Sequence, residues 1–120
     1  MLIIDKGGAF RDHVARLLGA RNLGIEWTDS APAAVRLCDE TPVSVVLVNS
    51  SAPGIDPYDL CSTIKSQDNG SSIAVVLMVS PSYSYDCSRA RAAGMRGMLD
   101  KPIADRTLVG TLKRLLSLPA

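Results

Sequence analysis

Five short apolar segments alternate with five segments of helical periodicity along this chain of 120 residues. The apolar segments are 2–5, 24–28, 43–48, 73–79 and 97–100, and the helical ones are 9–18, 30–39, 57–66, 85–93 and 107–116. The third and fourth apolar segments are apolar on nearly every residue, which is typical of parallel strands covered on both faces. Strict alternation of strands and helices favours a parallel sheet with helices on both sides. The chain is therefore predicted to form one doubly wound α/β domain over residues 1–120.

The composition excludes several classes of function. The hydrophobic fraction of 47% fits a packed domain, and the net charge of +1 gives no electrostatic reason to bind nucleic acid polymers or membranes. Three widely spaced cysteines and one histidine are too few for a zinc site, so neither a metal nor a cofactor is expected. No nucleophile–base–acid set emerges, so we expect no enzyme. The start of the chain carries no basic leader, which favours a cytoplasmic location.

Four residues stand at the carboxyl ends of predicted strands, namely Asp5, Asn49, Val79 and Lys101. In doubly wound sheets, ligands bind in the crevice outside these ends, at the point where the strand order reverses. We therefore expect the four residues to share one site.

The segment 44–56 reads SVVLVN followed by SSAPGID. It resembles the strand-to-loop segment of the response-regulator receiver domain, and Lys101-Pro102 resembles the Lys-Pro pair that follows the last strand in that family. The resemblance covers the whole chain. It implies a flavodoxin-like (βα)5 fold with strand order 2-1-3-4-5 and a cis peptide bond before Pro102. It also implies that Asn49 stands where the family has an aspartate that accepts a phosphoryl group.

Several residues depart from the family pattern. An amide is a very poor nucleophile, so Asn49 cannot form an acyl phosphate. Active receivers hold Mg²⁺ with two consecutive acidic residues, whereas here Asp5 is followed by Lys6, whose ammonium group we expect beside Asp5. Val79 takes the place of the hydroxyl-bearing switch residue, and strand alternation is expected to point Ser80 the other way. These departures predict a degenerate phosphorylation site without phosphotransfer.

Residues 83–96 form the most unusual segment, with two tyrosines and three arginines within fourteen residues. They are Tyr83, Tyr85, Arg89, Arg91 and Arg96. One interpretation is a solvated helix face. The other is a ligand-binding surface, because arginines bind phosphate groups and tyrosines stack on bases. A cyclic dinucleotide fits the second interpretation, and in bacteria cyclic di-GMP is the natural candidate.

The favoured interpretation is a pseudo-receiver, a regulatory domain of two-component signalling that binds partners instead of accepting phosphate. The resemblance implies a place in a larger bacterial chain such as a hybrid histidine kinase, with the kinase or other receiver domains as partners. It also implies docking through the fourth helix, fifth strand and fifth helix, where cyclic di-GMP would compete. Two alternatives stay open. One is a ligand-free scaffold or dimerisation module of a response regulator, and the other is a conventional phosphoacceptor that uses another carboxylate.

Overall fold

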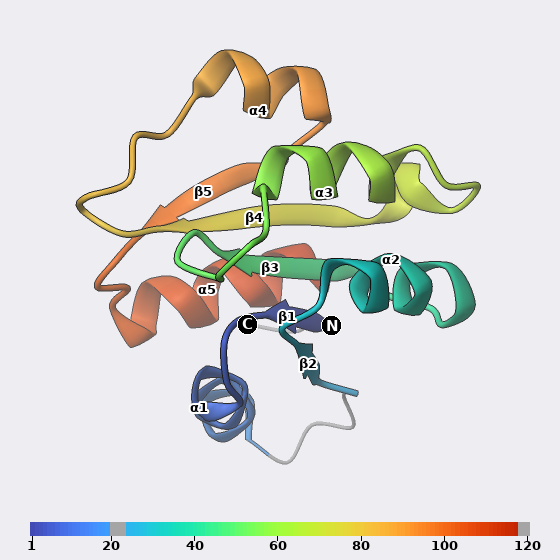
Figure 1. The fold of residues 1–120 in the computed structure, drawn as a ribbon. Helices are drawn as coiled ribbons and strands as arrows, with labels where there is room; N and C mark the ends of the chain where they lie inside the picture. The colour runs from blue at the N-terminus through green and yellow to red at the C-terminus, as the bar shows by residue number, and fades with distance from the viewer. Residues whose placement is uncertain (20–23, 118–120) are drawn as a thin grey trace.

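The computed structural model describes residues 1–19 and 24–117. Within these ranges, five parallel strands form one sheet in the order β2-β1-β3-β4-β5 (Figure 1). The strands are β1 (Leu2–Ile4), β2 (Glu26–Thr28), β3 (Val45–Asn49), β4 (Ala74–Val79) and β5 (Gly97–Asp100). The helices are α1 (Ala9–Leu18), α2 (Ala31–Glu40), α3 (Pro57–Lys65), α4 (Cys87–Ala93) and α5 (Asp105–Leu115), and a short 3-10 helix, η1 (Gly70–Ser72), precedes β4. The predicted flavodoxin-like fold and its strand order are confirmed.

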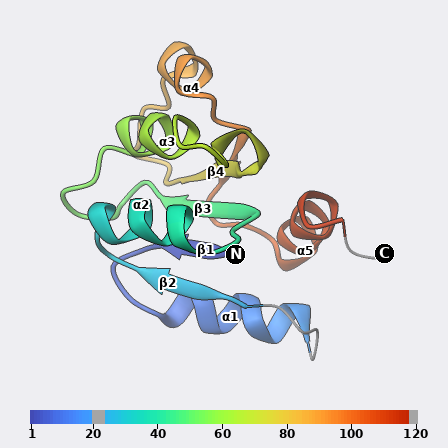
Figure 2. The same cartoon turned by 90° about the vertical axis from the view of Figure 1, so that its right-hand side faces the viewer.

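Helices cover both faces of the sheet, and the apolar strands explain why. Val46 and Val48 of β3 pack in a core layer with residues of α2, α3 and α4. Val45 and Leu47 point the other way, into a layer with residues of α1 and α5. Figure 2 shows α5 on the opposite side of the sheet from α2 and α3. A strand buried on both faces is apolar at nearly every position, and its alternation decides which layer each strand-end side chain faces.

Capping residues set where the helices near the strand ends begin. Asp56 precedes α3, and its carboxylate accepts a hydrogen bond from the backbone N–H of Tyr58 at 2.9 Å. Asp86 caps α4 in the same way and accepts the backbone N–H of Arg89 at 3.0 Å. Because of this cap, α4 begins at Cys87, two residues later than predicted.

The helices are short. Among the described residues the longest is α5, with 11 residues. None of the helices in the described ranges has both the length and the apolar character needed to cross a bilayer.

Candidate functional site

Three of the four strand-end residues meet at the carboxyl edge of the sheet. Asn49 ends β3, and its amide nitrogen Nδ2 donates a hydrogen bond to Oδ1 of Asp5 at 2.8 Å. Its amide oxygen Oδ1 accepts hydrogen bonds from Nζ of Lys101 and from the backbone N–H of Ser51, the latter at 2.9 Å. The side chain of Asn49 therefore links Asp5 to Lys101.

The bridging amide suits the charges on either side of it. Asp5 is only 8% exposed, and its Oδ1 also accepts the backbone N–H of Lys6 at 2.8 Å. Burial lowers the pKa of Lys101, the Asp5 carboxylate opposes this shift, and the charge of Lys6 adds to it. An amide carries a donor and an acceptor, so it satisfies the carboxylate and the ammonium group together. A carboxylate at position 49 would only accept, and it would repel Asp5.

Lys6 contributes its backbone to this site instead of its ammonium group. The expectation of a Lys6–Asp5 ion pair is wrong, because the Lys6 side chain is exposed and forms no ion pair within residues 1–19 and 24–117. The position still matters chemically. The resemblance implies that the family has a second acidic residue at position 6, and a lysine side chain there supplies no oxygen ligand for a metal ion.

Val79 does not face Asn49. Its side chain is buried in the core layer of α2, α3 and α4, together with Leu77. Met78 pairs in register with Asn49 and lies in the opposite layer. Alternation therefore places Ser80 on the same side as Met78 and Asn49. The prediction that Ser80 points away is wrong, and a hydroxyl-bearing residue follows β4 on the side of the site.

The strand-end residues do not fit the Mg²⁺ that the resemblance implies. Mg²⁺ demands near-octahedral oxygen ligands, usually with one or two carboxylates among them. Only Asp5 remains of the acidic pair, and its Oδ1 already accepts two hydrogen bonds. The Oδ1 of Asn49 faces the ammonium group of Lys101. In the part of the chain that the structure describes, no three His, Cys, Asp or Glu residues gather closely enough to hold a metal ion.

A cavity of about 500 Å³ opens beside these residues. Asp5, Asn49 and Lys101 form its polar side. The remaining lining comes from α1, β4, α5 and the neighbouring loops and consists of Phe10, His13, Met78, Pro81, Pro102, Ile103 and Leu108. The Lys101–Pro102 bond at its border is cis, as the resemblance implies. With walls of this kind, the cavity suits an apolar group better than a phosphoryl group.

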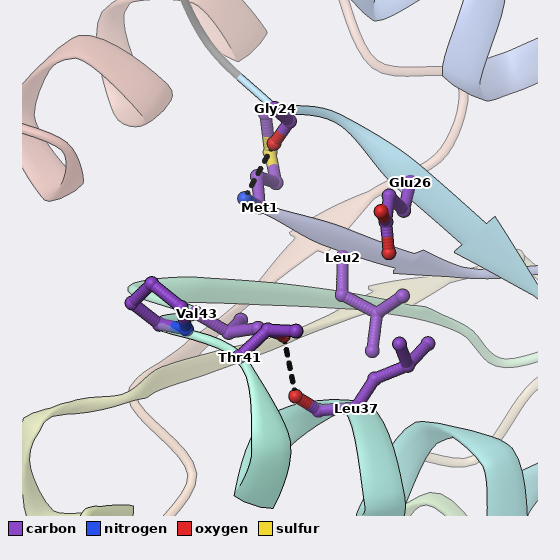
Figure 3. A pocket seen from close by; sticks show the side chains of 8 residues that line it. Met1, Leu2, Gly24, Glu26, Leu37, Thr41 and Val43 are labelled. Carbon is purple, nitrogen blue, oxygen red and sulfur yellow. Dashed lines mark hydrogen bonds between the residues drawn. The ribbon is translucent and has the colours of Figure 1, made fainter.

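A second cavity, of about 150 Å³, lies at the amino ends of β1 and β2 (Figure 3). The amino group of Met1 donates a hydrogen bond to the carbonyl oxygen of Gly24 at 2.9 Å. The backbone N–H of Thr41 donates to the carbonyl oxygen of Leu37 at 3.0 Å. Each of these polar groups thus already has a hydrogen-bond partner within the protein, and they lie at the opposite end of the strands from Asn49.

Arg89 is already bound by protein carboxylates. Its Nη2 lies 2.9 Å from Oδ2 of Asp56 and 3.6 Å from Oδ1 of Asp59. Its guanidinium group lies 4.6 Å from the ring centroid of Tyr58. The hydrogen bond from Arg89 holds the pKa of Asp56 below its usual value. Sequence reasoning missed Tyr58 and Asp56, because their contacts join α3 to α4 and no local pattern marks them.

Tyr83 and Tyr85 are half-buried against the same core layer. The ring centroid of Tyr85 lies 6.3 Å from that of Tyr58. Burial raises the pKa of Tyr83, and the neighbouring Tyr58 hydroxyl raises it further. Burial also raises the pKa of Tyr85. Both rings are therefore partly engaged in packing.

The structure does not gather the three arginines into one cluster. Arg89 lies in the first turn of α4, and Arg91 is exposed farther along the helix. Arg96 follows the helix, and its backbone N–H donates to the carbonyl oxygen of Val75 at 2.8 Å, near the amino end of β4. Arg89 and Arg96 thus lie at opposite ends of α4.

Known proteins share both the sequence pattern and the fold. A family model described as the response regulator receiver domain matches residues 1–113. The chain belongs to this receiver family. Among curated proteins, the receiver is similar to the heme response regulator HssR of Staphylococcus aureus, with 23% identity over 115 residues that cover 96% of this chain and 50% of HssR. The chain thus spans about half the length of the curated relatives that it matches.

Two similar solved structures come from histidine kinases. One is the signal receiver domain of a signal transduction histidine kinase from Syntrophus aciditrophicus, with a TM-score of 0.79, 28% identity, and coverage of 97% of this chain and 88% of that one. The other is the receiver domain of a sensor histidine kinase from Pseudomonas aeruginosa PAO1, with a TM-score of 0.78, 20% identity, and coverage of 97% and 95%. That receiver holds a magnesium ion in its active-site cleft. The present receiver shares the fold, yet its own strand-end residues do not fit that ion.

Proposed function

We propose that this receiver regulates a two-component signalling protein by docking on its neighbours, without accepting a phosphoryl group. The observation that carries the proposal is the amide bridge of Asn49 between Asp5 and Lys101. The amide stands in the place of the phosphoacceptor, and its oxygen accepts a hydrogen bond from the ammonium group of Lys101. Asp5 and Lys101, the charged residues at the strand ends, are thereby linked through Asn49, and this bridge connects the loops that follow β1, β3 and β5.

The setting that we propose is a hybrid histidine kinase in the bacterial cytoplasm. The chain spans half of its curated relatives, and similar receivers come from histidine kinases. The proposed partners are the kinase and other receiver domains of the same chain. The proposed docking surface is the face of α4, β5 and α5. There β5 is an edge strand, and its Met98 and Leu99 are half-exposed apolar side chains.

Beryllofluoride with Mg²⁺ tests the phosphotransfer part of this proposal. This anion mimics a phosphoryl group bonded to a carboxylate. Because Asn49 offers an amide, we expect the backbone chemical shifts of residues 49–51 and 101–103 to stay unchanged at millimolar beryllofluoride. Saturable shifts at those residues would show that the site still recognises a phosphoryl analogue, and the proposal would be wrong.

Cyclic di-GMP is the regulator that we propose for the α4 side of the docking surface. Arg91 and Arg96 are exposed and form no ion pair with another described residue. Tyr83 and Tyr85 keep part of their surface exposed for stacking on a base. To bind a phosphate, Arg89 would have to exchange its contacts with carboxylates.

A titration followed by chemical shifts checks this ligand. We expect shifts within residues 83–96 and affinity on the order of micromolar. Tyr83→Ala and Arg91→Ala should each weaken binding about tenfold, because a charge-assisted contact or a stacked base contributes roughly 1–3 kcal/mol. Lys101→Ala, at the other site, should change affinity little. If millimolar ligand produces no shifts, the surface is a protein-docking face only, and the ligand-free scaffold becomes the better account.

A further inference from the structure

A polar pocket of about 400 Å³ lies at the amino ends of β3, β4 and β5, at the opposite end of the strands from Asn49. Three cationic side chains line it: Lys65 at the end of α3, Arg96 before β5 and Arg114 in the last turn of α5. Serines complete its polar lining, among them Ser44, Ser71 and Ser117. This pocket shares no lining residue with the cavity beside Asn49.

The three cations meet without a partner of opposite charge. No aspartate or glutamate lines the pocket, and none of the three forms an ion pair with another described residue. Arg89, by contrast, has two carboxylates beside it. Like charges that lie close together repel one another, so an anion bound among them is stabilised. The chain as a whole carries a net charge of only +1, so this pocket is a local concentration of positive charge.

Lys65 is held in place by the protein itself. Its Nζ donates a hydrogen bond to the carbonyl oxygen of Ile73 at 2.7 Å, which leaves two N–H donors for a ligand. Its methylene stem lies along Gly94, where an added Cβ would come within 3.4 Å of Cγ of Lys65. Gly94 ends α4 with a φ of 85°, and Arg96 follows directly after this turn. The turn therefore brings two of the cations to the same pocket.

From this geometry we propose that the pocket binds a phosphate dianion, either free phosphate or the monoester group of a small molecule. Arginine pairs bidentately with phosphate oxygens, and lysine adds a point charge. The volume falls within the range of about 300–1,000 Å³ that is usual for small-molecule sites. The proposal goes beyond the docking function, because the bound phosphate would tie the ends of α3 and α5 to the start of β5. It would favour the conformation in which these ends lie together.

Isothermal titration calorimetry of this chain with guanosine 5′-monophosphate, inorganic phosphate and guanosine tests the proposal. We expect saturable binding of at least one phosphate compound and none of guanosine, and the two phosphate arms show whether the ester or the free ion is preferred. Chemical shifts should change at residues 71–74, 94–96 and 114–117. Lys65→Gln, Arg96→Gln and Arg114→Gln should each weaken binding at least about tenfold.

An exposed arginine elsewhere provides a matched control. Arg36→Gln removes one positive charge from α2, outside the pocket lining, and Arg36, like the pocket cations, forms no ion pair with another described residue. It should change phosphate affinity little, and a loss specific to Arg114→Gln supports the pocket independently of the docking function. The proposal is overturned if neither phosphate compound binds saturably. It is also overturned if Arg36→Gln weakens binding as much as Arg114→Gln does.

Discussion

The double variant Lys6→Asp/Asn49→Asp should be phosphorylated by acetyl phosphate and Mg²⁺. The two substitutions add carboxylates beside Asp5, and together the three supply the oxygen ligands that a hard dication prefers. The carboxylate at position 49 is also the missing nucleophile. Lys101 already reaches that position, and alternation places Ser80 on the same side. Intact-mass spectrometry should show the addition of one phosphoryl group.

The single variant Asn49→Asp separates the nucleophile from the metal ligands. It should label at least roughly 100-fold more slowly than the double variant, because a bound dication supplies several kcal/mol of transition-state stabilisation. It should also lose about 1–3 kcal/mol of stability at neutral pH, because the amide that donates to Asp5 at 2.8 Å is replaced by an acceptor. Equal labelling rates in the single and double variants would show that an acidic residue at position 6 is not needed to hold the metal ion.

Gly70→Ala should destabilise the fold by about 3 kcal/mol and lower Tm by roughly 10 °C, which thermal unfolding measures directly. Gly70 is buried in η1, between α3 and β4. A Cβ there would lie 2.4 Å from the carbonyl oxygen of Ile64 and 2.5 Å from that of Lys65. Both are backbone atoms at the end of α3, so relief requires a shift of the helix end or of η1.

Gly110→Ala is the matched control for this prediction. Gly110 lies inside α5, and an added Cβ there meets no atom within 4 Å. Because alanine favours helix over glycine, this change should stabilise the chain by about 0.5–1 kcal/mol. The packing account of Gly70 is wrong if both variants unfold at the same temperature as the unmodified chain.

Local patterns in the sequence predict most of the fold, because apolar runs and helical periodicity are short-range properties. The apolar run at the centre of the chain becomes β3, and its burial on both faces follows from its composition. The meeting of Asp5, Asn49 and Lys101 follows from topology, because the carboxyl ends of parallel strands share one edge. Helical periodicity alone places the start of α4 too early, because it does not reveal the cap at Asp86.

Side-chain direction and long-range contacts are harder to predict from sequence. The facing of Ser80 depends on the register that pairs Asn49 with Met78, which no local pattern reveals. The capture of Arg89 by Asp56 joins residues 33 positions apart. Lys6 has the expected place in the chain, but its flexible side chain extends into solvent and leaves only its backbone N–H beside Asp5. The sequence predicts which residue types stand at the site, whereas their hydrogen-bond and ion-pair partners are seen only in the structure.

Intact-mass spectrometry of the unmodified chain after incubation with acetyl phosphate and Mg²⁺ tests the central claim most directly. The Lys6→Asp/Asn49→Asp variant, treated in parallel, is the positive control. The amide of Asn49, bound between Asp5 and Lys101, predicts that the unmodified chain keeps its mass. A stable gain of one phosphoryl group on the unmodified chain would show that another carboxylate accepts phosphate, and it would contradict the proposed pseudo-receiver function.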